Sequence, residues 1–198
     1  MAQLISLNIQ RGRMTAGPIP LAVILLFCLL AAGPNAQAKA KVPGQPGAVR
    51  ALADAAYYDA LTALINNATQ RIDLAMFLFK TNPAGDNRPA ALVRTLVAAR
   101  QRGVAVRVIL EYSSHDPTLN RTNQETAQAL RKGGVAVFFD SPGRTSHAKL
   151  AVIDRRYCLV GSHNLTQSAL KHNHEFSLLL DNPPLAEEIL AYMETILQ

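Results

Sequence analysis

The sequence predicts an α/β fold in which a mixed, largely parallel β-sheet is flanked by helices on both faces. Short apolar runs of strand length alternate along the chain with longer segments whose apolar residues recur at helical spacing. Gly and Pro stand at many junctions, which favours short connections between strands and helices. Of the 198 residues, 49% are hydrophobic and 17% are charged, so a packed core is expected and global disorder is excluded.

Local patterns define the elements expected in the first half of the chain. Apolar residues at helical spacing predict a helix over residues 54–68. The nearly continuous apolar run at residues 72–79 has the length of a buried strand. A helix over residues 90–102 should end at Gly103, and the β-branched run at residues 104–110 predicts the next strand.

The second half continues the alternation. A helix over residues 121–132 is stopped by Gly133 and Gly134, and a strand follows at residues 135–139. The remaining expected elements are strands at 148–153, 157–160 and 175–180, helices at 164–170 and 184–197, and polar loops at 81–89 and 112–120. Strands that alternate with helices in this way are typical of a sheet covered on both faces.

The first 38 residues have the order of a secretory signal peptide. They contain no Asp or Glu, and Arg11 and Arg13 precede an apolar run over residues 19–32. The sequence Ala-Gln-Ala ending at Ala38 supplies small residues, so cleavage is expected after Ala38. The run of about 14 residues is shorter than the roughly 20 that span a bilayer.

This order divides the chain into three parts. Residues 1–38 are expected to be a signal peptide, residues 39–48 a linker rich in Lys, Pro and Gly, and residues 49–198 a single domain. The expected location is therefore the periplasm or the outside of the cell. Two alternatives stay open: an uncleaved signal that anchors the chain in the inner membrane, and a start at Met14.

The charge and cysteine content set further bounds. Lys and Arg number 20 against 14 acidic residues, and removal of the segment ending at Ala38 with its two arginines leaves 18 against 14, or +4. A basic balance favours an anionic partner.

Cys28 lies in the apolar run, so Cys158 alone remains after cleavage and cannot form an internal disulfide. We expect Cys158, in an apolar strand, to be a buried thiol.

Polar residues gather around the two strands expected near residue 150. His147 and Lys149 are two residues apart, so their side chains share one face of the strand. A nucleophile or base would thus stand beside a positive charge. Asp154 follows at the end of the same strand.

The next strand ends in a turn of the form Gly-Ser-x-Asn. Gly161 and Ser162 follow the strand, and Asn164 opens the expected helix. A hydroxyl, an amide and free backbone N–H groups can there point at an anion. Together with His147 and Lys149, this set suits a phosphodiester, which needs a nucleophile for phosphorus and donors for its oxygens.

The spacing His-x-Lys-(x)4-Asp-(x)6-Gly-Ser-x-Asn resembles the motif of the phospholipase D superfamily. The order of elements from about residue 47 to the end is similar to that of the small bacterial secreted endonucleases of this superfamily. Those chains carry one motif where most members carry two, and the five histidines here also include a single His-x-Lys. The resemblance implies a phospholipase D/nuclease-like fold.

The resemblance also implies a mechanism with two imidazoles. His147 would attack phosphorus to form a phosphohistidine, and a second histidine would protonate the leaving oxygen and then activate water. Since one chain supplies one motif, the second imidazole should be His147 of another copy in a two-fold homodimer. No metal ion and no cofactor are required by this scheme.

Roles for the other residues follow from the same resemblance. Lys149 and Asn164 would offset charge on the phosphate oxygens, and Glu175 would accept a hydrogen bond from the imidazole. Asp154 is grouped with the catalytic residues, although as a brace more than as a group acting on substrate. Ser162 would bind phosphate or support a neighbour. His163 and Arg144 are expected to contact substrate.

A histidine metal site is the alternative for the segment after the motif. His163, His172 and His174 lie close together in sequence, next to Glu175. No carboxylate-rich or Cys-rich set accompanies them, so we expect no metal.

Three functions fit the motif. The first is a metal-independent endonuclease without sequence preference, with Arg144, Arg155, Arg156 and Lys171 either contacting backbone phosphates or being ordinary surface. The second is a phospholipase D acting on lipid head groups, which the polar loop at 81–89 and the short chain disfavour. The third is a non-catalytic nucleic-acid-binding module. No stable protein partner besides a second copy is inferred.

Overall fold

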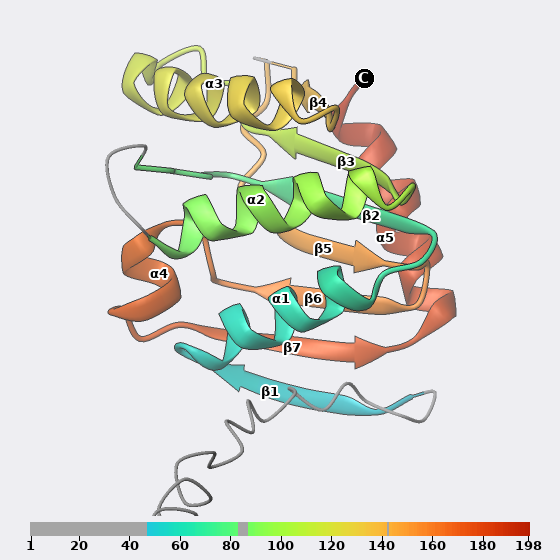
Figure 1. Cartoon of the computed structure of the whole chain (residues 1–198). Coiled ribbons are helices and arrows are strands. Elements are labelled where there is room, and N and C mark those ends of the chain that lie inside the picture. The colour runs from blue at the N-terminus through green and yellow to red at the C-terminus, as the bar shows by residue number, and fades with distance from the viewer. Residues whose placement is uncertain (1–46, 83–86, 142) are drawn as a thin grey trace, which may run out of the picture. The chain divides into compact units, whose positions relative to one another are not determined.

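A single sheet forms the centre of the computed structural model, which describes residues 47–82, 87–141 and 143–198 (Figure 1). The strands in these residues are β1 (Val49–Ala53), β2 (Arg71–Met76), β3 (Ala105–Leu110), β4 (Ala136–Phe139), β5 (Lys149–Ile153), β6 (Tyr157–Gly161) and β7 (Phe176–Asp181). The helices are α1 (Ala56–Asn67), α2 (Arg88–Gln101), α3 (Pro117–Lys132), α4 (Gln167–Lys171) and α5 (Pro183–Ile196). The strand order is β1-β7-β6-β5-β2-β3-β4.

The sheet is mixed, as predicted, but its neighbouring strands are not largely parallel. β2, β3 and β4 pair in parallel, whereas β2 with β5, β5 with β6, β6 with β7 and β7 with β1 pair antiparallel. The parallel pairs are those joined by the long helices α2 and α3, because a parallel connection needs a crossover. β5 and β6 are joined by a tight turn at residues 154–156, and such a turn gives an antiparallel hairpin.

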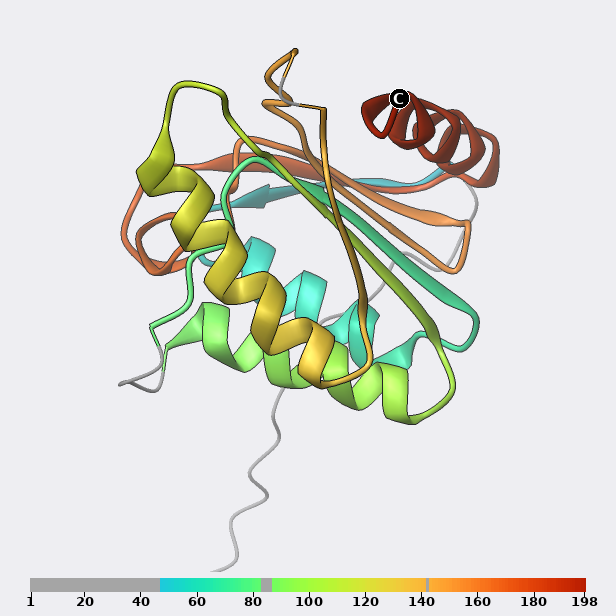
Figure 2. The same cartoon turned by 90° about the horizontal axis from the view of Figure 1, so that it is seen from above.

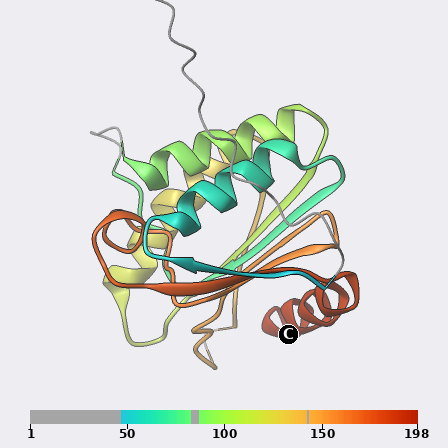
Figure 3. The same ribbon diagram turned by 90° about the horizontal axis from the view of Figure 1, so that it is seen from below.

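Helices cover both faces of the sheet, which confirms the predicted layers. Figures 2 and 3 show α1, α2 and α3 on one face and α5 on the other. The larger apolar core lies under α1, α2 and α3 and includes Leu64, Leu96 and Leu130. A smaller core beneath α5 includes Val152 and Met193.

Cys158 lies in the smaller core, as predicted. Its side chain is fully buried and forms no disulfide. Burial raises the pKa of the Cys158 thiol to about 11, and the nearby negative charge of Asp181 acts in the same direction. The thiol is therefore neutral at physiological pH and is not a nucleophile.

The starts of β1 and α3 differ from what the sequence predicts. β1 has the weak strand sequence Val-Arg-Ala-Leu-Ala, and only Leu52 of it is buried, so the strand depends on its pairing with β7. α3 starts at Pro117 rather than at residue 121. The carboxylate of Asp116 accepts hydrogen bonds from the N–H groups of Thr118 and Leu119, and Pro suits the first turn of a helix.

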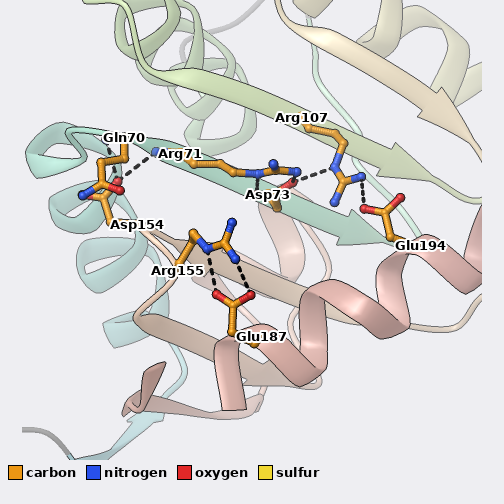
Figure 4. Close-up of polar contacts among 8 residues, drawn as sticks. All are labelled: Gln70, Arg71, Asp73, Arg107, Asp154, Arg155, Glu187 and Glu194. Atoms are coloured by element: carbon orange, nitrogen blue, oxygen red, sulfur yellow. Dashed lines mark hydrogen bonds and ion pairs between the residues drawn. The ribbon is translucent and has the colours of Figure 1, made fainter. Parts of the chain in front are cut away.

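An ionic layer joins the sheet to α5 (Figure 4). Asp73 of β2 is buried and accepts hydrogen bonds from Arg71 and Arg107, with Arg107 Nε at 2.6 Å. Arg107 also pairs with Glu194 of α5. Because a buried carboxylate needs its partners in place, this layer fixes how α5 lies on the sheet.

The predicted signal peptide, residues 1–38, and most of the predicted linker lie outside the described residues. Gly47 is the first described residue, and its N–H donates to the carbonyl of Asp181 at 2.6 Å. In the part of the chain that the structure describes, no helix has the length and apolar character needed to cross a bilayer.

Candidate active site

Most of the predicted site residues meet at one edge of the sheet, which we call the site edge. There β2 ends and β5 begins, with Met76 paired to Lys149, and β6 ends where β7 begins, with Gly161 paired to Ser177. β3 and β4 end at the same edge because both run parallel to β2. The segments that carry His147 and the residues after Gly161 therefore leave the sheet side by side.

His147 and Lys149 share one aromatic neighbour, Phe77. The imidazole of His147 is exposed, and its ring centroid lies 4.7 Å from that of Phe77. Lys149 is only 7% exposed, its Nζ lies 5.0 Å from the Phe77 ring centroid, and it donates to the carbonyl of His147 at 2.8 Å. The imidazole thus faces solvent while the ammonium beside it is held in place.

Burial lowers the pKa of the Lys149 ammonium, because desolvation disfavours the charged form. The negative charge of Glu175 acts in the opposite direction and raises it. A lysine that is buried without a carboxylate in direct contact is costly unless an anion binds next to it. Lys149 is therefore suited to receive a negatively charged group.

Asn164 lies between β6 and α4, which begins at Gln167 and not at Asn164 as predicted. Thr166 caps this helix, since its Oγ accepts from the N–H of Ala169 at 3.1 Å. Asn164 is thus not used as a cap. Its Oδ1 is buried and has no hydrogen-bond partner among the described residues. An unsatisfied buried amide oxygen costs stability, and only a hydrogen-bond donor can remove that cost. A phosphate oxygen is an acceptor, so it would bond to Nδ2 of this amide and not to Oδ1.

Ser162 supports a neighbour, which was one of its two predicted roles. Its Oγ donates to Oε2 of Glu175 and accepts from the N–H of Phe176 at 3.1 Å. Oε1 of Glu175 accepts from Asn173 at 3.1 Å. Among the described residues, both carboxylate oxygens of Glu175 bond to other side chains, and the predicted hydrogen bond from His147 is not formed. The catalytic role of Glu175 stays a prediction.

Gly161 has a packing role. A Cβ at this position would collide with the side chain and Cα of Ser177 and with the carbonyl of Phe176. The glycine of the motif therefore allows β6 and β7 to approach closely where both meet the site edge.

The prediction that His163 contacts substrate is wrong. Its ring is fully buried and stacks on Tyr57, with 4.3 Å between ring centroids. Nε2 lies 2.9 Å from the carbonyl of Asp54, and Nδ1 lies 2.7 Å from Oγ of Ser177. Because a carbonyl only accepts, Nε2 carries the proton, and burial lowers the pKa of His163, which keeps the ring neutral. His163 holds α1 against the sheet.

Asp154 lies at the opposite end of β5, so its place among the catalytic residues needs correction. Its carboxylate accepts from the backbone N–H groups of Thr69, Gln70 and Arg71 at 2.8–2.9 Å (Figure 4). Desolvation acts to raise the pKa of Asp154, but these bonds outweigh it and lower the pKa. The length of β5, about 15 Å, separates Asp154 from His147. These bonds fit a brace, which is the role that the sequence favours for Asp154.

The basic residues predicted near the site divide into two groups. Arg155 pairs with Glu187 and Arg156 with Asp181 at the edge opposite the site, which favours ordinary surface, one of their two predicted roles. Arg144 is exposed in the loop that leads to His147, where it lines a cavity of about 170 Å³. Lys171 is exposed at the end of α4.

The histidine metal cluster does not form. Of its members, His163 is buried in the core, and Nδ1 of the exposed His174 lies 3.5 Å from Asp54. Among the described residues, no three His, Cys, Asp or Glu side chains gather in a group that could hold a metal ion.

Three residues at the site edge were not predicted. Phe77 lies under both His147 and Lys149. Glu111 and Asp140 are buried acids directly after β3 and β4. The sequence carries a signal for the two acids, since each follows an apolar strand that ends at the edge where sites form in such sheets.

Comparison with known proteins now adds to the geometry. The domain family described as "Cardiolipin synthase, PLD-like domain" matches residues 61–197. The chain belongs to the phospholipase D superfamily. It is 30% identical over 101 residues to a phospholipase D of Rickettsia felis, and 30% identical over 129 residues to the human mitochondrial cardiolipin hydrolase. These matches cover 51% and 65% of the chain, and 48% and 46% of the relatives. The chain thus spans about half the length of these relatives.

Two solved structures share the fold. The phospholipase D family member Nuc from Salmonella typhimurium superposes with a TM-score of 0.62 at 23% identity, covering 75% of this chain and 93% of that one. NucT from Helicobacter pylori superposes with a TM-score of 0.56 at 20% identity, covering 76% and 96%. These likenesses confirm the predicted fold.

Proposed function

We propose that this protein is a phosphodiesterase, and more closely a metal-independent endonuclease that hydrolyses nucleic acid as a homodimer. The observation that carries the proposal is the arrangement of His147 and Lys149 on the ring of Phe77. An exposed imidazole can reach phosphorus, and a buried ammonium beside it can hold a phosphate oxygen. Membership of the phospholipase D superfamily supports the same chemistry.

The proposed reaction has two steps. In the first, a ring nitrogen of His147 forms a bond to phosphorus, the bond to the leaving oxygen breaks, and that oxygen takes a proton from a second imidazole. In the second, the second imidazole accepts a proton from water, the water oxygen bonds to phosphorus, and the bond to His147 breaks. Lys149 and Asn164 stabilise the charge on the non-bridging oxygens in both steps.

A homodimer would supply the second imidazole. One chain carries a single His-x-Lys. β1 and β7 also leave apolar side chains exposed along their length, from Phe176 at the site edge (57% exposed) through Leu178 (36%) to Val49 near the opposite edge (59%). Phe176 directly follows Glu175, so a second copy packed on this surface would lie beside the site.

Nucleic acid is the favoured substrate because basic residues extend from the site. Arg88, Arg94 and Lys171 line a polar cavity of about 380 Å³ between α2 and α4. α4 follows closely after Asn164, and a row of cations beside a phosphate site can contact neighbouring backbone phosphates. The two relatives named phospholipase D and cardiolipin hydrolase support a lipid diester as the second candidate.

A substrate panel tests the proposal. The purified protein is incubated in excess EDTA with plasmid DNA, single-stranded RNA, and vesicles of phosphatidylcholine or cardiolipin. Cleavage of nucleic acid that EDTA leaves unchanged and that His147→Ala abolishes supports the endonuclease. Release of lipid head groups alone favours the second candidate, and binding of DNA without cleavage of any substrate favours the non-catalytic module.

Light scattering tests the dimer. We expect twice the mass of one chain, and we expect Phe176→Asp to give an inactive monomer. An active wild-type monomer would refute the shared site. We also propose that residues 1–38 direct export to the periplasm or beyond, which the mass of the protein recovered from that fraction would test.

A further inference from the structure

Two buried acids lie at the site edge beside the loop that carries His147. Glu111 directly follows β3 and is 1% exposed, and Asp140 directly follows β4 and is 6% exposed. Leu110 and Phe139, the residues before them, are paired in the sheet, so the two carboxyl groups leave neighbouring strands at the same level. A buried carboxylate requires hydrogen-bond donors or a proton.

The donors available to this pair are few. The N–H of Ser146 donates to Oε2 of Glu111 at 2.6 Å and to Oδ2 of Asp140 at 3.2 Å. The N–H of Tyr112 donates to Oδ1 of Asp140 at 2.5 Å. Oε1 of Glu111 is buried and has no partner among the described residues. Two backbone N–H groups cannot stabilise two buried negative charges, so one of the acids must keep a proton.

Glu111 is the acid that keeps the proton. Burial and, next, the neighbouring Asp140 raise the pKa of Glu111, the N–H of Ser146 lowers it, and together they bring it to about 7. A neutral Glu111 can donate its proton to the Asp140 carboxylate and still accept from Ser146.

The other groups around the pair leave this assignment unchanged. α3 contributes the neutral Asn123, whose Nδ2 donates to the carbonyl of Glu111. The titratable or charged side chains nearby are Tyr112 after β3, Arg144 and His147 in the loop, and Tyr192 of α5, which shares a cavity with Arg144 and Ser146. Asp140 is the charged side chain that shifts the pKa of Glu111.

We infer that Glu111 and Asp140 are a positioning pair for His147: they share one proton and hold the backbone N–H of Ser146. Ser146 directly precedes His147, so the pair fixes the backbone from which the imidazole extends. The inference rests on the proposed function, in which His147 is the nucleophile. When the pair loses its proton, two adjacent negative charges repel and the loop is held less firmly.

The pH dependence of Glu111→Gln tests the pair. A glutamine accepts from Ser146 and donates to Asp140 as the neutral acid does, but it cannot ionise. Rates on the small diester bis(p-nitrophenyl) phosphate are measured for both proteins. We expect the ratio of the variant kcat to the wild-type kcat to rise about 10-fold from pH 6 to pH 8, since an acid of pKa about 7 is protonated in about one molecule in ten at pH 8. Groups other than Glu111 are common to both proteins and do not change the ratio.

Two further variants complete the kinetic test. Glu111→Leu should lower kcat at pH 6 while KM changes little, and Glu111→Gln should restore it. Asp181→Asn alters another buried acid, one that pairs with Arg156 at the opposite edge, and its kcat ratio should not vary with pH. A constant ratio for Glu111→Gln would overturn the inference.

Hydrogen exchange separates this inference from the proposed function. We expect the amide of Ser146 to exchange slowly at pH 6 in the wild type and in Glu111→Gln, and at least 10-fold faster in Glu111→Leu, because its acceptor is lost. This pattern supports the hold of the Glu111 and Asp140 pair on Ser146 even if no diester is cleaved, in which case only the proposed function fails. Equal exchange rates of the Ser146 amide in the three proteins would show that the pair does not hold this backbone.

Discussion

The two ends of strand β5 carry parts of one sequence motif but have opposite chemistry. At one end, His147 is exposed, Lys149 is buried without a carboxylate in contact, and Asn164 has an amide oxygen without a partner among the described residues. At the other end, Asp154 accepts three backbone hydrogen bonds and one from a hydroxyl.

This difference distinguishes residues suited to bind a ligand from residues that stabilise the fold. The first end holds a buried ammonium without a carboxylate in contact, as expected where an anion binds, beside an amide whose nitrogen can donate to that anion. The second end has its hydrogen bonds already made, as expected where a side chain stabilises the fold. Residues that share a motif therefore do not all belong to the reaction, and each must be located before a role is assigned.

The largest expected effect is at the first end. His147→Ala should lower kcat for a diester by at least about 1,000-fold, because the nucleophile is lost. The free energy of unfolding should change by less than about 0.5 kcal/mol, because the ring is exposed. Steady-state kinetics and urea unfolding measure the two quantities, with His115→Ala, in an exposed loop, as the control. Retention of full activity would show that His147 is not the nucleophile.

Lys149→Met should have the next largest effect on activity. Loss of one fixed charge at the phosphate should lower kcat by about 100-fold to 1,000-fold. The free energy of unfolding should equal or exceed that of the wild type, because an apolar side chain of similar length replaces a buried charge. Lys132→Met, on the exposed end of α3, is the matched control and should change neither quantity. A fall in stability with unchanged kcat would show that Lys149 stabilises the fold and does not act in the reaction.

Asp154→Ala should show the reverse pattern. Removal of the acceptor for the residue 69–71 backbone should lower the free energy of unfolding by about 3 kcal/mol. Molecules that remain folded should keep their kcat, because Asp154 lies far from His147. Thermal melting and activity per folded molecule check this, and Asp154→Asn, which keeps one acceptor oxygen, should lose less. A loss of kcat without a loss of stability would show that Asp154 acts in the reaction.

The last comparison concerns how the stability contributed at each of the two edges depends on pH. Glu111 has a folded-state pKa of about 7 against an ordinary value of 4.5, so its contribution to stability is full below pH 4.5 and is lost as pH rises to 7. The difference should reach about 3 kcal/mol. The pKa of Asp154 is lowered, so its contribution is full above its ordinary value of 3.8 and is lost as pH falls below it. Urea unfolding of the wild type and Glu111→Gln at pH 4.5 to 8 measures the first slope, which the variant should lack.

Local sequence was sufficient for most of the fold and for the centre of the site. Apolar runs and helical spacing located the strands and helices to within a few residues. β1 is the exception, because it forms a strand through its pairing with β7 and not through its own sequence. The spacing of His147 and Lys149 correctly predicted that they lie close together, since both contact Phe77, but β5 begins at Lys149, so His147 lies in the preceding loop and not on the strand. These features depend on neighbours in the chain, which a sequence shows directly.

Other features needed the tertiary structure. His163 stands between Ser162 and Asn164 in the motif, but only the position of α1 shows that its ring is covered by Tyr57. Glu111 and Asp140 meet because β3 and β4 are neighbours, and their contact with Ser146 depends on the path of a loop. Antiparallel pairing of β5 with β2 also could not be inferred from strand content alone.

The pairing of β1 with β7 has a consequence for how the molecule is made. It joins Val49 to Leu180, so the first strand to leave the ribosome finds its partner only after nearly all of the chain has been synthesised. Until then the hydrogen-bonding groups of that strand have no place in the sheet. Folding should therefore be completed after translation, and chains that terminate before residue 176 should not reach the native state.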